Sequence, residues 1–310
     1  MQLLPTGLAY FAEVARTGSV TSAADTLRVA PSAISRQIAK LEADLGLALF
    51  DRKPRGMVLT DAGARLVAHA RRSEAESAAL VDELRAGTDH EARPVVVACS
   101  EGFGRRLVPR AMARFRRHHP DVTFELDIVA RQEATRRVVE GIADIAVTYA
   151  MGPQHHVRVE CSTVTDVAVI VPAGHELARR DRVGLAELCD HPLALASPST
   201  SQRELFDLGA GIEGLTVTPV LVCDGLAPLH EFVRDGGGVA LVGDLGDLDR
   251  DAFSDGVSYV RLDHPVFRQR EAQVQTMPGR RLPAPAMQFV GVLVSLLRGH
   301  RDDDRTAEPA

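Results

Sequence analysis

The sequence predicts an α/β protein with a separate helical module at its N-terminus. Apolar residues recur at helical spacing over residues 7–60, and short apolar runs alternate with helical stretches from residue 95 onward. Charge divides the chain in the same way: residues 1–72 hold ten Lys or Arg and six Asp or Glu, a net of +4 within a chain of net charge −6. A basic module on an acidic body is typical of a nucleic-acid binder with a second function.

The N-terminal module is predicted to contain three short helices. The first carries apolar residues between 8 and 15 and stops at Thr17-Gly18, after which Ser19 can cap the next helix. The second covers residues 23–27. The third begins at Pro31, which is acceptable at a first helical position, and ends at Gly46. Two short helices joined by residues 28–30 make a helix-turn-helix.

A ribbon and a long helix are expected next. Residues 51–59 are basic and surround a Pro/Gly turn, which predicts a two-stranded wing. Thr60 then caps a helix to about Ala86, whose small and apolar residues alternate in spacings of four and three, typical of a coiled-coil seam. A helix lying on its own domain is the alternative, because Ala and Ser make a weak seam. The seam positions are Leu66, Ala70, Ser73, Ser77, Leu80 and Leu84.

The remaining chain is predicted to be an α/β domain with a parallel sheet. The expected strands are 95–98, 123–128, 145–147 and 167–171, with helices at 105–118 and 132–140 between them. Residues 185–243 repeat the alternation, and a last helix includes residues 292–297. No apolar run is long enough to cross a bilayer, so we expect a cytoplasmic protein that does not bind membranes.

Neither a metal site nor an enzyme is indicated. The pairs His118-His119 and His155-His156 have no further ligand at metal-binding spacing, and Gly236-Gly237-Gly238 lacks the spacing of a phosphate loop. The motif of a nucleophile elbow is missing from the sequence. The four cysteines are far apart in sequence, which favours reduced thiols. We therefore expect no cofactor, no metal and no catalytic residues.

Five stretches of the N-terminal region closely resemble the winged helix-turn-helix of LysR-type transcriptional regulators. They are residues 18–27 (GSVTSAADTL), 32–42 (SAISRQIAKLE), 45–46 (LG), 49–52 (LFDR) and 59–63 (LTDAG). Residues 107–109 (LVP), 115–120 (FRRHHP), 141–146 (GIADIA) and 236–241 (GGGVAL) resemble the effector domain of the family more loosely.

The resemblance implies a winged helix-turn-helix over residues 1–60, a dimerisation helix over 61–88 and an effector domain over 94–300. The effector domain has two lobes built like a periplasmic binding protein, the first from 94–162 and 267–300 and the second from 163–266. Residues 301–310 are expected to be a disordered tail. The implied partners are a double-stranded DNA operator, a small-molecule effector between the lobes and a second copy of the chain through the linker helix, with tetramers common. RNA polymerase is a further candidate partner.

The resemblance also carries DNA contacts onto particular residues. They are Pro31, Ser32, Ser35, Arg36 and Gln37 in the third helix, and Arg52, Lys53 and Arg55 in the wing. The chemistry agrees, because short hydroxyls approach base edges closely, Arg36 can pair with guanine or phosphate, and the wing cations suit backbone contacts. Ala30 departs from the family, which usually has a Ser cap there, so this helix should lack about 1 kcal/mol of cap stabilisation.

The effector is expected at the carboxyl ends of strands, where helices begin. The candidate residues are Ser100, Gly102, Arg131, Thr148, Ser197, Ser199 and Thr200. Hydroxyls and an arginine favour a small carboxylate over a neutral molecule, although Glu101 adds negative charge at the rim. Gly243 stands where the family usually has Pro, which leaves the shape of that wall open.

Two other functions remain as alternatives. One is a redox-sensing regulator of the same fold that uses a cysteine pair such as Cys189 and Cys223. The other is a transport-type binding protein or an enzyme with an incidental N-terminal domain. A signal sequence or measurable turnover would favour the latter, and the sequence offers no support for either.

Overall fold

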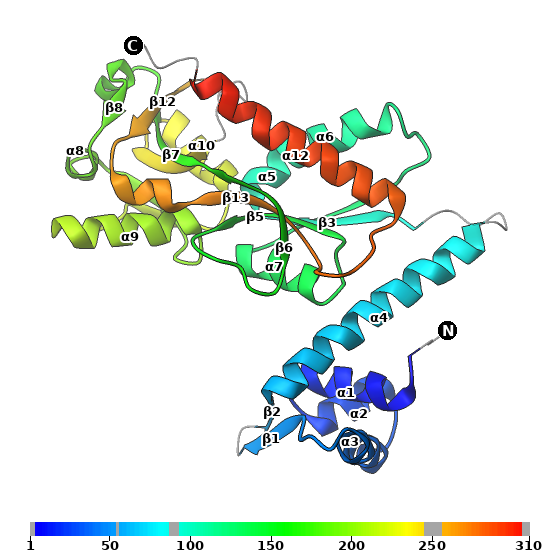
Figure 1. The fold of residues 1–310 in the computed structure, drawn as a ribbon. Helices are drawn as coiled ribbons and strands as arrows, with labels where there is room; N and C mark the ends of the chain where they lie inside the picture. Colours follow the sequence, from blue (N-terminus) through cyan, green and yellow to red (C-terminus); the bar gives the residue numbers. More distant parts are fainter. Residues whose placement is uncertain (1–3, 54–55, 87–92, 245–255, 306–310) are drawn as a thin grey trace. The chain divides into compact units, whose positions relative to one another are not determined.

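The computed structural model describes residues 4–53, 56–86, 93–244 and 256–305, which form two compact units. The N-terminal unit runs to Arg93 and also contains Val139–Ile142 and Met277–Pro283; the second unit holds the rest of the chain. Figure 1 labels most of the helices and strands of both units. Within the described ranges, no helix is long and apolar enough to span a membrane.

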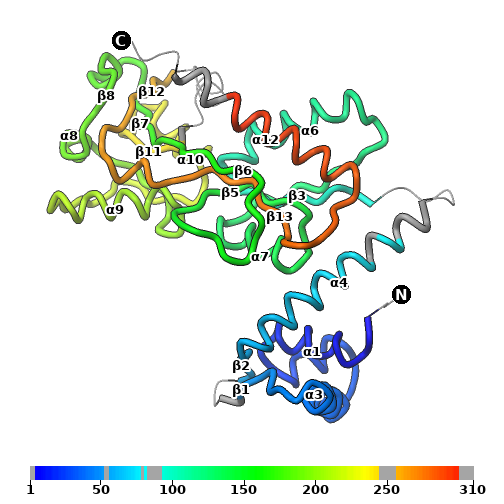
Figure 2. The backbone as a smooth tube through the Cα atoms, in the orientation of Figure 1, coloured from blue at the N-terminus to red at the C-terminus, as the bar shows by residue number. Residues whose placement is uncertain are grey.

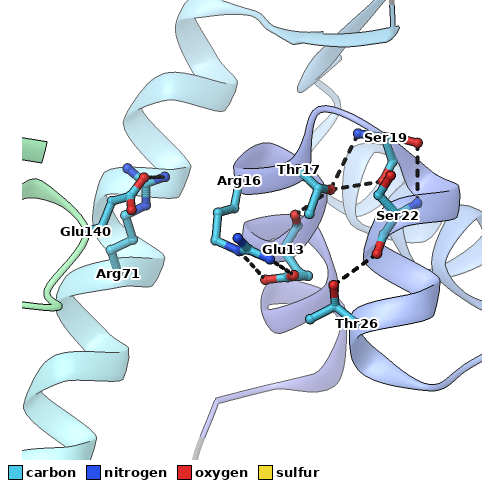
Figure 3. Close-up of polar contacts among 8 residues, drawn as sticks. All are labelled: Glu13, Arg16, Thr17, Ser19, Ser22, Thr26, Arg71 and Glu140. Carbon is cyan, nitrogen blue, oxygen red and sulfur yellow. Dashed lines mark hydrogen bonds and ion pairs between the residues drawn. The ribbon is translucent and has the colours of Figure 1, made fainter. Parts of the chain in front are cut away.

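Three helices form the core of the N-terminal unit: α1 (Thr6–Thr17), α2 (Val20–Leu27) and α3 (Pro31–Leu45). Their apolar faces meet around Phe11, Ile34 and Ile38, which are almost fully buried. The predicted cap of α2 is confirmed, because the backbone N–H of Ser22 donates to Ser19 Oγ at 3.4 Å, as Figure 3 shows. Local caps and apolar spacing therefore determine this helix-turn-helix.

The predicted ribbon consists of β1 (Phe50–Lys53) and β2 (Gly56–Leu59), which pair antiparallel; its turn, residues 54–55, lies outside the described residues. The wing is tied to the helices by backbone bonds. Met57 N–H donates to Gly18 C=O at 2.9 Å. A Cβ at Gly56, whose φ is 123°, would lie 2.7 Å from that same oxygen, so a glycine is required here.

The long helix α4 (Asp61–Ala86) begins at Thr60, whose Oγ1 accepts from Gly63 N–H at 3.0 Å. The first half of the expected coiled-coil seam contacts its own unit: Leu66 packs on the N-terminal core and Ala70 is fully buried. Further along, Arg71 donates to Glu140 at 3.4 Å (Figure 3). Leu80 is 49% exposed, and the side chain of Leu84 lies outside the described residues. Of the seam positions whose side chains the structure describes, Leu80 is thus the most exposed to a partner helix.

Substitution of Gly63 tests how closely the start of α4 packs against the backbone at Leu49. A Cβ at this position would lie 2.1 Å from the carbonyl oxygen of Leu49, so Gly63→Ala must displace backbone. We expect a loss of about 1–3 kcal/mol in the free energy of unfolding of the N-terminal unit, measured by urea denaturation of the full chain. Gly7→Ala is the matched control, because its Cβ would make only an ordinary 3.4 Å contact. Equal stability of the two variants would contradict this packing.

The first sheet of the second unit has the strand order β4-β3-β5-β13-β6. Its strands β3 (Val95–Cys99), β4 (Phe124–Ile128) and β5 (Ile145–Ala150) are parallel, as predicted, but β13 (Glu271–Thr276) runs antiparallel to both β5 and β6 (Arg158–Val164). The expectation of a purely parallel sheet was therefore wrong, because the chain returns to this sheet through β13. Its helices are α5 (Glu101–Arg105), α6 (Leu107–Arg116), α7 (Arg131–Val139) and α12 (Ala284–Arg305).

The second sheet has six strands in the order β10-β9-β11-β7-β12-β8. They are β7 (Asp166–Pro172), β8 (Arg182–Val183), β9 (Leu193–Ala196), β10 (Leu221–Cys223), β11 (Val239–Asp244) and β12 (Val257–Leu262). Helices α8 (Leu185–Cys189), α9 (Ser201–Glu213) and α10 (Leu226–Arg234) and two short 3₁₀ helices, Glu176–Arg179 and Pro265–Gln269, complete this part. Alternate residues of β7 face two separate apolar clusters, so both faces of the sheet are covered.

We call the first sheet with its helices the first lobe, and the second sheet with its helices the second lobe. Two crossover segments connect the lobes. The chain leaves the first lobe between β6 and β7, at Thr165, and returns before β13, at Arg270, as Figure 2 traces. The crossovers lie side by side, because Thr165 N–H donates to Arg270 C=O at 2.9 Å. At the C-terminus, α12 continues to Arg305, so the expected disordered tail does not begin at residue 301: a formed helix adds residues at little cost. Residues 306–310 lie outside the described residues.

Candidate functional site

The exposed face of α3 is the candidate DNA-contacting surface. Ile34 and Ile38 anchor the helix in the core, which leaves Ser32, Ser35 and Arg36 exposed on the opposite side. Pro31 is exposed at the first helical position. Gln37 is half-buried, and its Oε1 would lie 3.4 Å from a Cβ added at Gly7. Gln37 is therefore the least available of the five predicted contacts.

The N-terminus of α3 has no side-chain cap. Ala30 precedes the helix in an extended conformation and makes no capping hydrogen bond, as its methyl side chain dictates. Pro31 has no N–H, and the N–H of Ala33 donates to Ala30 C=O at 2.9 Å. Ser32 is therefore the first-turn residue that can offer both an N–H and a hydroxyl to a ligand. An N-terminus of this kind suits a DNA phosphate, because both the N–H groups and the helix dipole favour negative charge.

The predicted DNA contacts of the wing are only partly described by the structure. Arg52 and Lys53 lie in β1, but their side chains, and all of Arg55, fall outside what the structure describes. Their contacts with DNA remain predictions.

A cavity of about 580 Å³ lies between the two lobes of the second unit. This volume is in the range of sites that hold small molecules. Residues of both lobes line it: Ser100, Gly102 and Arg131 from the first lobe, Ser199 and Thr200 from the second. Five of the seven predicted effector residues thus meet at one cavity, although they are up to 100 positions apart in sequence.

The other two predicted residues, Thr148 and Ser197, are not among those that line the cavity. Thr148 is fully buried, and its hydroxyl bonds with Ser100 Oγ at 2.9 Å, so it orients Ser100 instead of facing a ligand. Ser197 Oγ donates to the carboxylate of Asp224, which does line the cavity. Ser197 follows the end of β9 as expected, whereas Thr148 lies inside β5, which continues to Ala150. Sequence position also does not fix which way a side chain points.

Sequence reasoning missed Arg105, Tyr149, Asp224 and His230, which also line the cavity. Strand alternation could have found Tyr149, because it is the neighbour of Thr148 in β5 and must face the opposite way. His230 sits in α10 without any motif around it. Burial, with a further contribution from the cation of Arg105, lowers the pKa of His230 below 6.5, so its imidazole is neutral at pH 7.

The wall at Gly243 is shaped by a buried arginine. The guanidinium of Arg270 lies 4.0 Å from the ring centre of Tyr149 and donates to Asp166 C=O at 2.8 Å. A Cβ at Gly243 would lie 2.9 Å from Arg270 Nη2 and 3.1 Å from the Tyr149 hydroxyl. The arginine and the tyrosine thus fill the space that a larger residue would need, which accounts for glycine at this position.

The cysteines do not form a redox pair in this structure. Cys189 packs on the apolar cluster at one face of the second sheet, whereas Cys223 packs on the cluster at the other face. Burial, followed by the negative charges of Glu213 and Asp190, raises the pKa of Cys189. Burial also raises the pKa of Cys99 to about 12, with Asp127 adding to the shift. Such thiols carry little reactive thiolate at pH 7. Among the described residues, no cluster of three His, Cys, Asp or Glu side chains could hold a metal.

Two family models match the chain. Residues 6–64 match the bacterial regulatory helix-turn-helix protein of the lysR family, and residues 88–298 match the LysR substrate-binding domain. The RuBisCO operon transcriptional regulator of Allochromatium vinosum is 28% identical over 241 residues, which cover 76% of this chain and 78% of the relative.

Solved structures show the same fold. A full-length OxyR variant from Pseudomonas aeruginosa superposes with a TM-score of 0.61 at 19% identity, covering 96% of this chain and 95% of that one. Full-length CbnR in complex with its target DNA gives 0.52 at 22% identity, covering 94% and 98%.

A helix-turn-helix with a wing, joined by a long helix to two lobes around a cavity, defines an effector-binding transcriptional regulator. The chain belongs to the LysR family of transcriptional regulators, which bind DNA operators and small-molecule effectors and form oligomers. The matched helix-turn-helix family is described as regulatory, and the named relative is a transcriptional regulator.

Proposed function

We propose that this chain is a cytoplasmic, non-catalytic regulator whose sequence-specific DNA binding is controlled by a small molecule held between its two lobes. The observation that carries the proposal is the pairing of an exposed recognition face on α3 with a 580 Å³ cavity in the second unit. Neither feature alone would suffice, because a helix-turn-helix needs no cavity and a binding protein needs no DNA-reading helix.

On the DNA side, the proposed contacts are Pro31, Ser32, Ser35, Arg36 and Gln37 from α3, with Arg52, Lys53 and Arg55 from the wing. Arg36 has the chemistry to read guanine by two parallel hydrogen bonds, and the serines can approach bases or phosphates. The wing cations supply contacts with the phosphate backbone, which position the module without reading sequence.

On the effector side, the proposed contacts are Ser100, Gly102, Arg131, Ser199 and Thr200, with Thr148 and Ser197 acting through their neighbours. Arg131 begins α7 in the first lobe and lines the cavity, with its side chain 18% exposed. A guanidinium in this position favours an effector that carries a carboxylate or another oxyanion.

Arg131→Ala tests the effector side. Thermal-shift screening of metabolite acids identifies a ligand, and calorimetry then compares variants. We expect Arg131→Ala to weaken binding at least about tenfold, because a charge-assisted hydrogen bond is lost. Arg136→Ala is the control, since Arg136 lies on the same helix, is 49% exposed and pairs with Glu133 instead.

The same ligand must change operator affinity. Linkage requires the operator to change effector affinity by the same factor, and Arg131→Ala should weaken both effects together. An acid that regulates DNA binding but binds wild type and Arg131→Ala equally would show that the cavity residues have been assigned wrongly.

A further inference from the structure

Two of the contacts that join the lobes across the cavity use a carboxylate of the chain itself. The first joins Arg131, at the start of α7 in the first lobe, to Glu204, in the first turn of α9 in the second lobe. Arg131 Nη2 donates to both carboxylate oxygens, at 2.7 and 2.9 Å. The two side chains are 18% and 32% exposed, so the pair is only partly screened by water.

The second contact caps a helix from the opposite lobe. Helix α10 begins after Gly225, which has no side chain to cap it. Instead, Glu101 Oε1 of the first lobe accepts from Leu226 N–H of the second lobe at 2.9 Å. A carboxylate at a helix N-terminus satisfies a backbone N–H and interacts favourably with the helix dipole.

These contacts occupy groups that would attract an anion. Arg131, Glu101 and Leu226 all line the cavity, and both the guanidinium of Arg131 and the N-terminus of α10 already hold a carboxylate of the chain. We propose that Glu101 and Glu204 latch the two lobes of the effector-free protein, and that an anionic effector enters by replacing Glu204 at Arg131. This inference rests on the proposed function, because it describes how the effector site is regulated.

The latch has a consequence for selectivity. Glu204 is an intramolecular competitor held at a high effective concentration, so an anion must outcompete it to reach Arg131. A neutral molecule that fits the cavity leaves the ion pair intact and gains nothing from breaking it. Because a ligand shifts a conformational equilibrium only by its differential affinity, anions are the ligands that can release this latch.

Hydrogen exchange of the full-length protein tests the latch without DNA or effector. Glu204→Gln removes the charge that holds Arg131 but does not touch Leu226. We expect the Leu226 amide to exchange at least about tenfold faster in this variant, because opening the lobes also withdraws Glu101. Glu213→Gln is the matched control on the same helix, since Glu213 contacts His264 within the second lobe, and it should leave the rate unchanged. Wild-type exchange in Glu204→Gln would overturn the latch.

A charge swap separates the ion pair from general damage. Arg131→Glu alone should speed Leu226 exchange, and Arg131→Glu with Glu204→Arg should restore protection, because the pair is rebuilt with reversed ends. Loss of protection in the double variant, with wild-type melting behaviour, would overturn the role of this pair.

The displacement step is tested with malonate and inorganic phosphate as probes. In titrations followed by thermal shift, Glu204→Gln should bind at least one probe about tenfold or more tightly than wild type, since the internal competitor is gone. Equal or weaker binding of both probes would overturn displacement. If the latch is wrong but the proposed function is right, these tests fail while the protein still binds its operator. If the proposed function is wrong, the protein shows no sequence-specific DNA binding even though Leu226 exchange behaves as the latch predicts.

Discussion

Arg36→Ala is expected to weaken operator binding by about 1–3 kcal/mol per half-site, roughly 5- to 150-fold, while the protein stays folded. Arg36 is exposed on α3, and the helix beneath it is anchored by the fully buried Ile34. A contact on so rigid a support is lost completely when the guanidinium is removed. A gel-shift assay at fixed salt measures the effect.

Two further variants are measured in the same experiment: Arg16→Ala as a control, and Lys53→Ala as a test of the phosphate contacts. Arg16→Ala removes an arginine that pairs with Glu13 on α1, and it should change operator affinity little. Lys53→Ala should weaken binding to all sequences alike and lower the salt dependence by about one unit, because a phosphate contact carries no sequence information. Equal operator affinity of Arg36→Ala and wild type would remove Arg36 from the interface.

The second large effect concerns assembly. Leu80→Asp with Leu84→Asp should raise the dissociation constant of the dimer by about 100-fold or more, since carboxylates would be buried between paired helices without partners. Leu80 is 49% exposed on α4, which suits a position covered by a second copy of the chain. Sedimentation analysis of the full-length protein measures the constant, and operator affinity should fall in parallel because two half-sites no longer bind together.

The control is Ala68→Asp, which places a carboxylate at an exposed position of the same helix outside the seam. It should leave the dimer intact. If the Leu80 and Leu84 variant sediments as wild type, the dimer interface lies elsewhere than the distal half of α4.

Features determined by neighbouring residues could be predicted from the sequence. Ser19 and Thr60 accept the hydrogen bonds expected of helix caps, and α3 starts at Pro31 and ends before Gly46 as its pattern requires. These are local effects of side-chain chemistry and helical spacing. The parallel part of the first sheet follows in the same way from alternating strands and helices.

Two of the strands that sequence reasoning missed, β6 and β13, lack the usual apolar pattern. Strand β13 buries Gln273 and Gln275, and Gln275 Nε2 donates to Gln273 Oε1 at 2.9 Å, so its sequence suggests a polar loop. Strand β6 alternates exposed and buried residues weakly and pairs only with β13. Their positions depend on long-range pairing, which local patterns do not encode.

The segments that form the cavity could be predicted from the sequence, but the contacts among their side chains could not. Strand ends and helix starts identified the segments that meet there, including those of Ser100, Arg131 and Thr200. The direction of Thr148 depends on its contact with Ser100 inside the first lobe, 48 residues away in the chain. The pairing of Arg131 with Glu204 depends on how the two lobes pack, across 73 residues of chain. Contacts of that kind follow from tertiary structure alone.

Sequence-specific DNA binding is measured by sequencing the genomic fragments that the full-length protein retains at fixed salt. We expect a small set of fragments that share a motif with two half-sites, spaced by one helical turn of DNA or a multiple of it, and loss of that enrichment in Arg36→Ala. Retention that depends only on fragment length and salt concentration, equal in wild type and Arg36→Ala, would contradict this expectation.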